Sequence, residues 1–112
     1  MFPTEHRLRH EKDIKALFAK SKSVFGLYVG MRFRKNTQEH TRIAVVCGTK
    51  VHKSAVVRNR LKRQVRAIVH ERLTKIPPGY DILFFLRKEA LDANFDQLKE
   101  QIETSLKKAK LV

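Results

Sequence analysis

Residues 50–72 read KVHKSAVVRNRLKRQVRAIVHER, and their aliphatic side chains recur at helical spacing. At about 100° per residue they fall within one arc, which is typical of an amphipathic helix with one buried face. Ser54 can serve as the N-cap, because its hydroxyl can accept a hydrogen bond from the first turn. We therefore predict a helix from Ser54 to about Leu73, roughly 30 Å long. Its predicted buried stripe comprises Val57, Leu61, Val65, Ile68 and Val69.

The other side of this predicted helix is basic. No Asp or Glu occurs between His40 and His70, so the acidic i,i+4 partners that usually neutralise a solvated Lys/Arg face are missing. Such cations repel one another unless an anion binds among them. Arg60 lies away from the main ridge on the helical wheel and is expected to contact a different segment of that anion, or only the surroundings of the first turn. The other residues that we assign to this basic side and to the loop before it are Lys50, Lys53, Arg58, Asn59, Lys62, Arg63 and Arg66.

The composition limits the possible classes of protein. With 112 residues, 42% of them hydrophobic, the chain can form one domain with a single modest core. A formal net charge of +14 favours a polyanionic partner, and nucleic acid is the default. No apolar run is long enough for a membrane span, and the first residues lack the apolar segment of a signal peptide. The lone Cys47 cannot form an internal disulfide, which suits a cytoplasmic protein.

Strands are predicted on both sides of the basic helix. Residues 28–34 alternate in polarity, whereas residues 42–47 and 80–86 are short apolar runs bounded by glycine or proline. Residues 23–25 can add a further short strand. The succession of strand, long helix and strand predicts a β-α-β unit with parallel strands, which is ordinarily right-handed.

Two further helices are predicted near the ends of the chain. Residues 11–20 carry apolar side chains at i, i+3 and i+4 spacing, and residues 94–110 begin with a capping-box pattern at Asn94 and Gln97. Residues 1–9 are predicted to form an extended arm, because Pro3 disfavours a helix at the residue before it. The predicted order is αβββαβα. The last helix would bury Phe95, Leu98, Ile102 and Leu106.

Residues 28–34 provide a second candidate binding surface. Val29, Met31 and Phe33 would face one side of the strand, and the other side would combine a ring with two cations. Such a combination is expected where bases stack and phosphates are neutralised, although a solvated sheet face is the alternative. The residues of the second side are Tyr28, Arg32 and Arg34.

We expect no catalysis by this chain itself. The sequence has neither a GxxxxGK[ST] phosphate loop nor a GxSxG elbow, and the basic face contains no carboxylates that could hold Mg²⁺. The histidines are scattered without metal-site spacing, so no metal ligands are predicted among them. They are His6, His10, His40, His52 and His70.

A family resemblance rests on the basic helix. The string Arg58-Asn59-Arg60-Leu61-Lys62-Arg63, with Lys53 before it and Arg66 after it, resembles the RNR motif of the bacterial ribonuclease P protein family. The resemblance extends over nearly the whole chain. It implies one α+β domain over residues 1–112, built as an αβββαβα sandwich with a mixed four-stranded sheet. It also implies an unusual left-handed β-α-β crossover, contrary to the ordinary rule.

The resemblance also implies a function. In ribonuclease P an RNA subunit with bound Mg²⁺ removes the 5′ leader of precursor tRNA, and the small basic protein docks on that RNA and contacts the leader. The expected partners are therefore the RNA subunit and precursor tRNA, with no membrane and no other protein required. Mg²⁺ would serve the RNA-based holoenzyme without a dedicated site in this chain.

The same resemblance divides the candidate residues into two groups. Residues of the first helix line the leader site in similar proteins; Phe18 matches such a residue, and Ile14 replaces what can be an aromatic. The expected leader-binding residues are Ile14, Phe18, Tyr28, Arg32 and Arg34. The expected residues for binding the RNA subunit are Lys50, Lys53, Arg58, Asn59, Arg60, Lys62, Arg63 and Arg66.

Two other classes of protein are compatible with the composition. A structural RNA-binding protein, such as a ribosomal protein, would sediment with ribosomal subunits and leave tRNA processing unaffected. A DNA-binding helix-turn-helix is less favoured, because it needs a short helix just before the recognition helix, where a strand is predicted. An RRM is disfavoured as well, because residues 28–35 lack the aromatic spacing of its signature.

Overall fold

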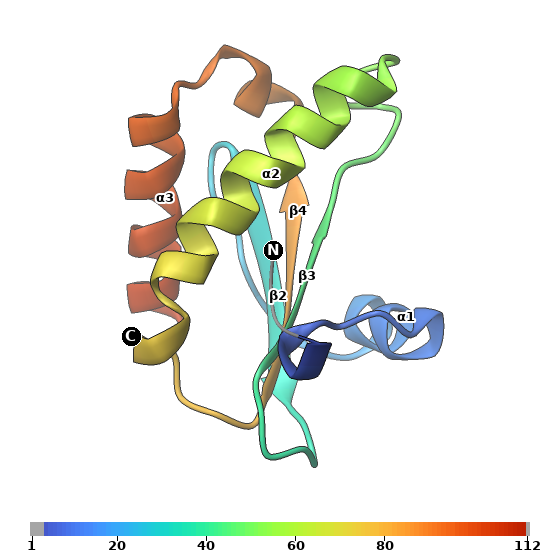
Figure 1. The fold of residues 1–112 in the computed structure, drawn as a ribbon, viewed down its shortest axis with the longest axis vertical. Coiled ribbons are helices and arrows are strands. Elements are labelled where there is room, and N and C mark those ends of the chain that lie inside the picture. Colours follow the sequence, from blue (N-terminus) through green and yellow to red (C-terminus); the bar gives the residue numbers. More distant parts are fainter. Residues whose placement is uncertain (1–3, 112) are drawn as a thin grey trace.

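A four-stranded sheet lies at the centre of the fold (Figure 1). The computed structural model describes residues 4–111, and the elements follow the predicted order αβββαβα. Three short 3₁₀ helices, Thr4–His6, Leu73–Lys75 and Lys88–Asp92, were not predicted by the hydrophobic pattern. The α-helices are Glu11–Ala19 (α1), Ala55–Glu71 (α2) and Phe95–Lys108 (α3), and the strands are Lys22–Val24 (β1), Val29–Lys35 (β2), Arg42–Val46 (β3) and Tyr80–Leu86 (β4).

The sheet is mixed, with the strand order β1-β2-β4-β3. Strands β1 and β2 and strands β2 and β4 are antiparallel, whereas β3 and β4 are parallel and are joined through α2. In Figure 1, α2 lies in front of the sheet, both parallel strands run upward, and β4 lies to the left of β3. The chain therefore makes a left-handed crossover, as the family resemblance implies and contrary to the usual hand.

Helix α2 begins as its sequence predicts. Ser54 is the N-cap, and its hydroxyl accepts a hydrogen bond from the Val57 amide at 3.4 Å. The helix ends at Glu71, slightly before the predicted end, and the chain continues as a 3₁₀ turn before Pro77. The predicted stripe is confirmed, since Val57 is half-buried against the core and the other four residues are buried.

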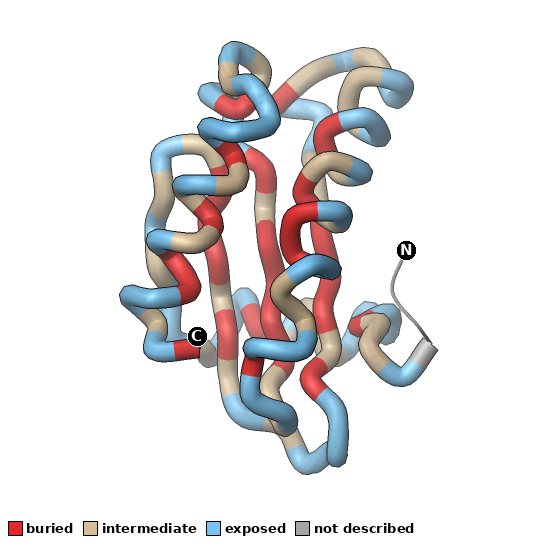
Figure 2. The backbone as a smooth tube through the Cα atoms, turned by 60° about the vertical axis from the view of Figure 1, so that its left-hand side comes forward, coloured by how far each residue is buried: buried red, intermediate tan, exposed pale blue. Residues whose placement is uncertain are grey.

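The sheet has a core on each face, and Figure 2 shows its buried strands between the surrounding helices. The larger core packs α2 and α3 against alternate residues of the strands, among them Met31, Val45 and Phe84. The smaller core lies on the opposite face under α1 and the N-terminal segment. It consists of Leu8, Leu17, Ala44 and Leu83, with Ile14 and Val46 packed at its edge.

Helix α3 confirms one prediction and contradicts another. The capping box is present, because Asn94 accepts from the Gln97 amide at 2.8 Å and Gln97 accepts from the Asn94 amide at 2.9 Å. Phe95, however, is 37% exposed, so its prediction as a core residue is wrong. It lies in the first turn of α3, and the buried stripe of the helix begins only at Leu98.

The N-terminal segment is less extended than the sequence predicts. Residues 4–6 form a 3₁₀ turn, and Arg7 then pairs with Ile43 at the edge of β3. His6 anchors this turn, because its Nδ1 lies 2.8 Å from the Thr41 carbonyl oxygen and its ring contacts that of His40. These tertiary contacts favour a turn over the extended arm; residues 1–3 of that arm lie outside the described residues.

A buried ion pair holds α1 to the sheet. Asp81 of β4 is fully buried and accepts from Arg42 Nε at 2.9 Å and Arg42 Nη2 at 2.8 Å. Arg42 also reaches Asp13 of α1 at 3.4 Å. The hydrogen bonds from Arg42 to Asp81 raise the pKa of the Arg42 guanidinium and outweigh its partial desolvation. The pair therefore links strands β3 and β4 to α1.

Breaking this pair should destabilise the protein. We expect Asp81→Asn to lower the free energy of unfolding by about 3 kcal/mol, because Arg42 would lose its buried carboxylate partner. Urea denaturation followed by circular dichroism measures this change. Asp92→Asn is the control, since Asp92 is exposed in a 3₁₀ turn. Equal stability of the two variants would contradict a structural role for the pair.

Candidate nucleic-acid interface

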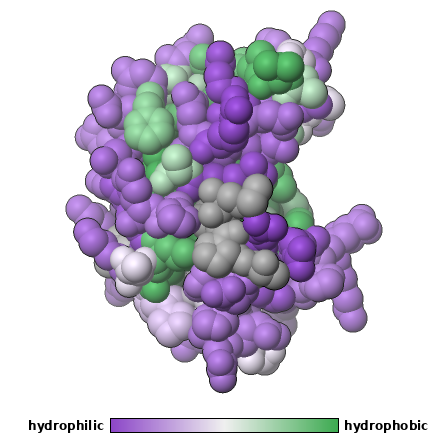
Figure 3. All heavy atoms as spheres, in the orientation of Figure 1, coloured by the Kyte–Doolittle hydropathy of each residue, from purple (hydrophilic) through white to green (hydrophobic). Residues whose placement is uncertain are grey.

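The outer side of α2 forms a basic ridge, which we define as Asn59, Arg60, Lys62, Arg63 and Arg66. The buried stripe of α2 faces the sheet, so these side chains are directed to the other sides of the helix. Within residues 4–111 none of its four cations forms an ion pair, and Figure 3 shows this face of the molecule as largely hydrophilic. The ridge is therefore positively charged without internal neutralisation. Asn59, Arg60 and Arg63 are exposed, and Lys62 and Arg66 are half-buried.

Arg58 differs from the rest of the predicted group. Its Nη1 donates to the carbonyl oxygens of His52 at 2.9 Å and Lys53 at 2.8 Å. The guanidinium therefore holds the loop before α2 against the first turn of the helix. Lys50 and Lys53 are exposed on that loop, so Arg58 positions the backbone from which these two lysines project.

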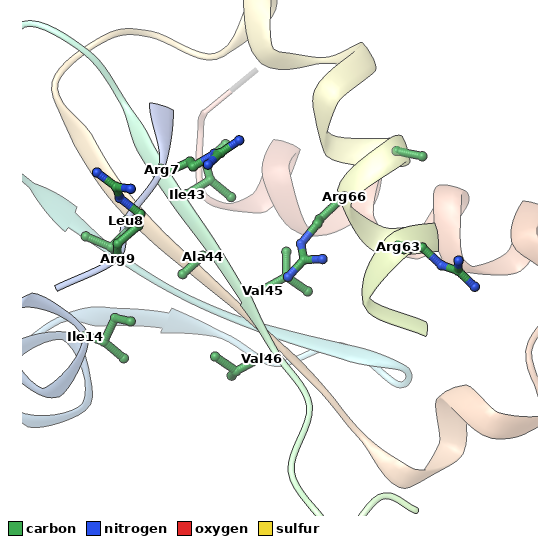
Figure 4. Close-up of a pocket in the computed structure, with 11 residues that line it drawn as sticks. Arg7, Leu8, Arg9, Ile14, Ile43, Ala44, Val45, Val46, Arg63 and Arg66 are labelled. Carbon is green, nitrogen blue, oxygen red and sulfur yellow. The ribbon is translucent and has the colours of Figure 1, made fainter. Parts of the chain in front are cut away.

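A groove at the edge of β3 extends the basic ridge (Figure 4). It has a volume of about 640 Å³ and an apolar floor that includes Ala44 and Val45. Arginines line it from two elements, namely Arg63 and Arg66 of α2 and Arg7 and Arg9 of the N-terminal segment. The Arg66 side chain points toward Val45, whereas that of Arg63 points away from it (Figure 4). The helical pattern of residues 50–72 does not reveal Arg7 and Arg9. The available signal is the alternation of Arg7, buried Leu8 and Arg9, which is typical of a strand-like edge.

A second candidate surface lies on the face of the sheet that α1 only partly covers. We define this open sheet face as Phe18, Arg32, Arg34 and Phe85. The Arg32 guanidinium lies 5.5 Å from the centre of the Phe18 ring, a cation–π contact, and Phe18 is 50% exposed. The Nε atoms of Arg32 and Arg34 are buried and have no hydrogen-bond partner. An unsatisfied buried donor costs about 1–3 kcal/mol, so a shift of either side chain that brings its Nε to an incoming acceptor would be favoured.

Phe85 belongs to this face although the apolar pattern of β4 predicts a strand covered on both sides. Four of the five residues in the run Ile82–Leu86 are buried, but Phe85 is only half-buried. Its ring lies over Gly30 on the neighbouring strand, where an added Cβ would come within 2.0 Å of Phe85 Cζ. Glycine at position 30 therefore leaves room for an aromatic ring two positions from Arg32 along β2.

Two of the predicted leader-site residues are not part of the open sheet face. Ile14 is half-buried against the smaller core, with Leu17 as its fully buried neighbour. Tyr28 precedes β2, its ring packs against the larger core, and its amide donates to Gln101 Oε1 of α3 at 3.0 Å. The structure thus brings together Phe18, Arg32 and Arg34 but separates Tyr28 from them, because the strand alternation begins only at Val29.

The two candidate surfaces consist mainly of cations and aromatic rings. In residues 4–111 no three His, Cys, Asp or Glu side chains converge as metal ligands would. No helix in that range is both long and apolar enough to cross a bilayer. What the two surfaces can do is neutralise phosphates and stack on bases, so they define a basic α+β protein suited to binding RNA.

Comparisons with known proteins agree with this class. The family model for Ribonuclease P matches residues 2–110. The chain is 36% identical over 114 residues to the ribonuclease P protein component of Pseudanabaena sp. strain PCC 6903, covering 100% of this chain and 97% of that protein. It is 32% identical over 111 residues to the same component of Lactobacillus delbrueckii subsp. bulgaricus, covering 96% and 89%.

Solved structures show the same fold. The ribonuclease P protein from Thermotoga maritima superimposes with a TM-score of 0.81 at 33% identity, covering 91% of this chain and 96% of that one. The Staphylococcus aureus protein gives a TM-score of 0.86 at 26% identity, covering 95% and 96%. The chain belongs to the ribonuclease P protein family. Membership associates it with RNA binding and tRNA processing.

The thiol of Cys47 provides a probe of the basic ridge. Burial raises the pKa of the Cys47 thiol, whereas the nearby charges of Lys62 and Arg58 partly lower it. Phosphates bound on the ridge would neutralise those charges and raise the pKa further. We therefore expect the pH profile of Cys47 alkylation by iodoacetamide to shift upward when RNA is bound. Lys62→Gln should shift the profile of the free protein in the same direction; an unchanged profile on RNA binding would place the RNA elsewhere.

Proposed function

We propose that this chain is the subunit of ribonuclease P that binds the catalytic RNA through the basic ridge and the 5′ leader of precursor tRNA through the open sheet face. One observation carries the proposal. The two surfaces lie on different sides of the molecule, since α2 packs on the sheet face opposite α1. A protein with two such surfaces can hold two RNA segments at once and thereby promote removal of the leader.

The ridge suits a large folded RNA. Its cations lack acidic partners in the described chain, so binding phosphates releases counterions without first breaking ion pairs. Arginine predominates, and its planar fork can donate two parallel hydrogen bonds to one phosphate. Lys50, Lys53 and the edge groove would extend this contact to both ends of the helix face. Arg58 would act mainly by positioning the loop of Lys50 and Lys53.

The open sheet face suits a single strand. Phe18 offers an exposed ring on which a base can stack, and base–aromatic stacking contributes about 1–3 kcal/mol. Arg32 can meet the adjacent phosphate through its guanidinium while it contacts that ring. Phe85 offers a second ring further along the face. Ile14 would contribute only through its support of α1.

Mg²⁺ would act in the RNA subunit, and this chain would contribute by lowering the concentration of Mg²⁺ that is needed. Two RNAs that approach each other repel through their phosphates, and either bulk cations or protein side chains can offset this repulsion. The RNA subunit would catalyse the hydrolysis of the phosphodiester. The chain would thus be part of an endonuclease, acting in the cytoplasm, without being its catalytic component.

Cleavage of precursor tRNA tests the proposal directly. A bacterial ribonuclease P RNA at low Mg²⁺ should cleave poorly alone, and near-stoichiometric addition of this protein should restore release of the leader with a correct mature 5′ end. The readout is the length of radiolabelled products on a gel. RNA binding without stimulation would instead support a structural RNA-binding role, such as that of a ribosomal protein.

Two substitutions separate the proposed surfaces. We expect Arg63→Ala to weaken binding to the RNA subunit and to reduce the magnitude of its salt slope by about 0.7 to 0.9 per lost phosphate contact. Phe18→Ala should leave assembly intact but reduce the preference for leader-bearing over leaderless substrate. Filter binding at several salt concentrations measures both effects. Identical losses in the two variants would contradict the assignment of separate surfaces.

A further inference from the structure

A third cationic surface lies at the β1 edge of the sheet, away from the basic ridge. It is a pocket of about 1150 Å³ between the β1 strand and the C-terminal turn of α3. Tyr80 and Phe33 contribute aromatic groups to its wall. We call it the lysine pocket, and its cations are Lys20, Lys22, Arg34, Lys35, Lys108 and Lys110.

Nothing in the described chain neutralises this pocket. None of the residues described along its wall is acidic, and none of its six cations takes part in an ion pair. The dipole of α3 accounts for lysines in the last turn of that helix, such as Lys108. It does not account for the cations that β1, β2 and the segment after α1 bring to the same place. Such convergence from several elements favours a bound polyanion.

The lysine pocket and the open sheet face share Arg34 and are connected along the chain at the end of α1. Arg34 lines the pocket and lies two positions after Arg32 on the same face of β2. Lys20 also lines the pocket and directly follows α1, the helix that carries Phe18. A strand held between Phe18 and Arg32 can therefore reach the pocket without losing contact with the protein.

The two edges of the sheet carry different cationic surfaces. The basic ridge and the edge groove adjoin β3, whereas the lysine pocket adjoins β1 at the other edge. The two edges are separated by three inter-strand spacings, about 14 Å. A single strand that leaves an RNA bound on the β3 side and follows the open sheet face would reach the lysine pocket at the β1 edge.

We infer that the lysine pocket binds the part of the leader that lies farther from the cleavage junction than the part at Phe18 and Arg32. This inference rests on the proposed function. Lysines are compact point charges that contact phosphates without reading the bases, so binding here would depend on leader length rather than leader sequence. The site would give precursors with long leaders additional affinity.

The test compares three substrates bound to the assembled holoenzyme: tRNA without a leader, precursor with a short leader that ends at the open sheet face, and precursor with a long leader. The variant is Lys22→Ala with Lys108→Ala. The matched control, Lys88→Ala with Lys107→Ala, removes two exposed lysines that do not line the pocket. Lys110 is left unchanged because its φ of 60° lies in the left-handed region, where substitution would confound the comparison.

We expect the wild-type holoenzyme to bind the long leader more tightly than the short one. The variant should lose that difference while keeping its affinity for the other two substrates, and the magnitude of its salt slope for the long leader should fall by about 0.7 per lost phosphate contact. The control variant should behave as the wild type. Circular dichroism confirms that both variants are folded.

Other outcomes would overturn the inference in distinguishable ways. If the wild type binds long and short leaders equally, or if the variant retains the difference, the pocket does not hold the leader. If the variant loses the same affinity for all three substrates, the pocket contacts the tRNA body or the RNA subunit instead. If the wild type does not distinguish leader-bearing from leaderless tRNA at all, the proposed function fails, and the inference fails with it.

Discussion

Parallel pairing of β3 with β4 is the constraint on which the rest of the structure depends. Parallel strands cannot be joined by a tight turn. A longer connection must therefore carry the chain back to the end of the sheet at which the first strand began. Here that connection is α2, whose buried stripe packs on the sheet. Because one side of α2 is used for this packing, its cations must lie on its other sides. The position of the basic ridge is thus a consequence of how the sheet is built.

The opposite face of the sheet is covered differently, and this difference creates the second surface. Helix α1 is short and supplies the buried Leu17 to a small core, while its Asp13 pairs with Arg42 of β3. The remaining part of that face leaves the Phe18 ring exposed and the Phe85 ring partly exposed, beside Arg32 and Arg34, whose Nε atoms are buried without a hydrogen-bond partner.

The charge of the protein connects its stability with its function. A net charge of +14 on 112 residues opposes the folded state through self-repulsion, and only a few of the cations form ion pairs in the described chain. Bound RNA would relieve this repulsion at the basic ridge, at the open sheet face and at the lysine pocket.

Local chemistry in the sequence determined the elements and one of the surfaces. Helical spacing identified α2 and its buried residues, Ser54 and Asn94 identified two helix starts, and the missing acids identified the basic ridge. These signals lie within a few residues of one another, so no knowledge of the fold is needed to interpret them.

Tertiary structure decided the features that depend on contacts between distant segments of the chain. The sequence alone could not place Phe85 over Gly30, direct Tyr28 into the larger core, or anchor residues 4–6 as a turn, because each depends on a partner from another element. The groove with Arg7 and Arg9 and the lysine pocket likewise combine residues that are far apart along the chain. Periodicity specifies which face of an element is apolar, but only packing decides which faces meet and which cations gather in one place.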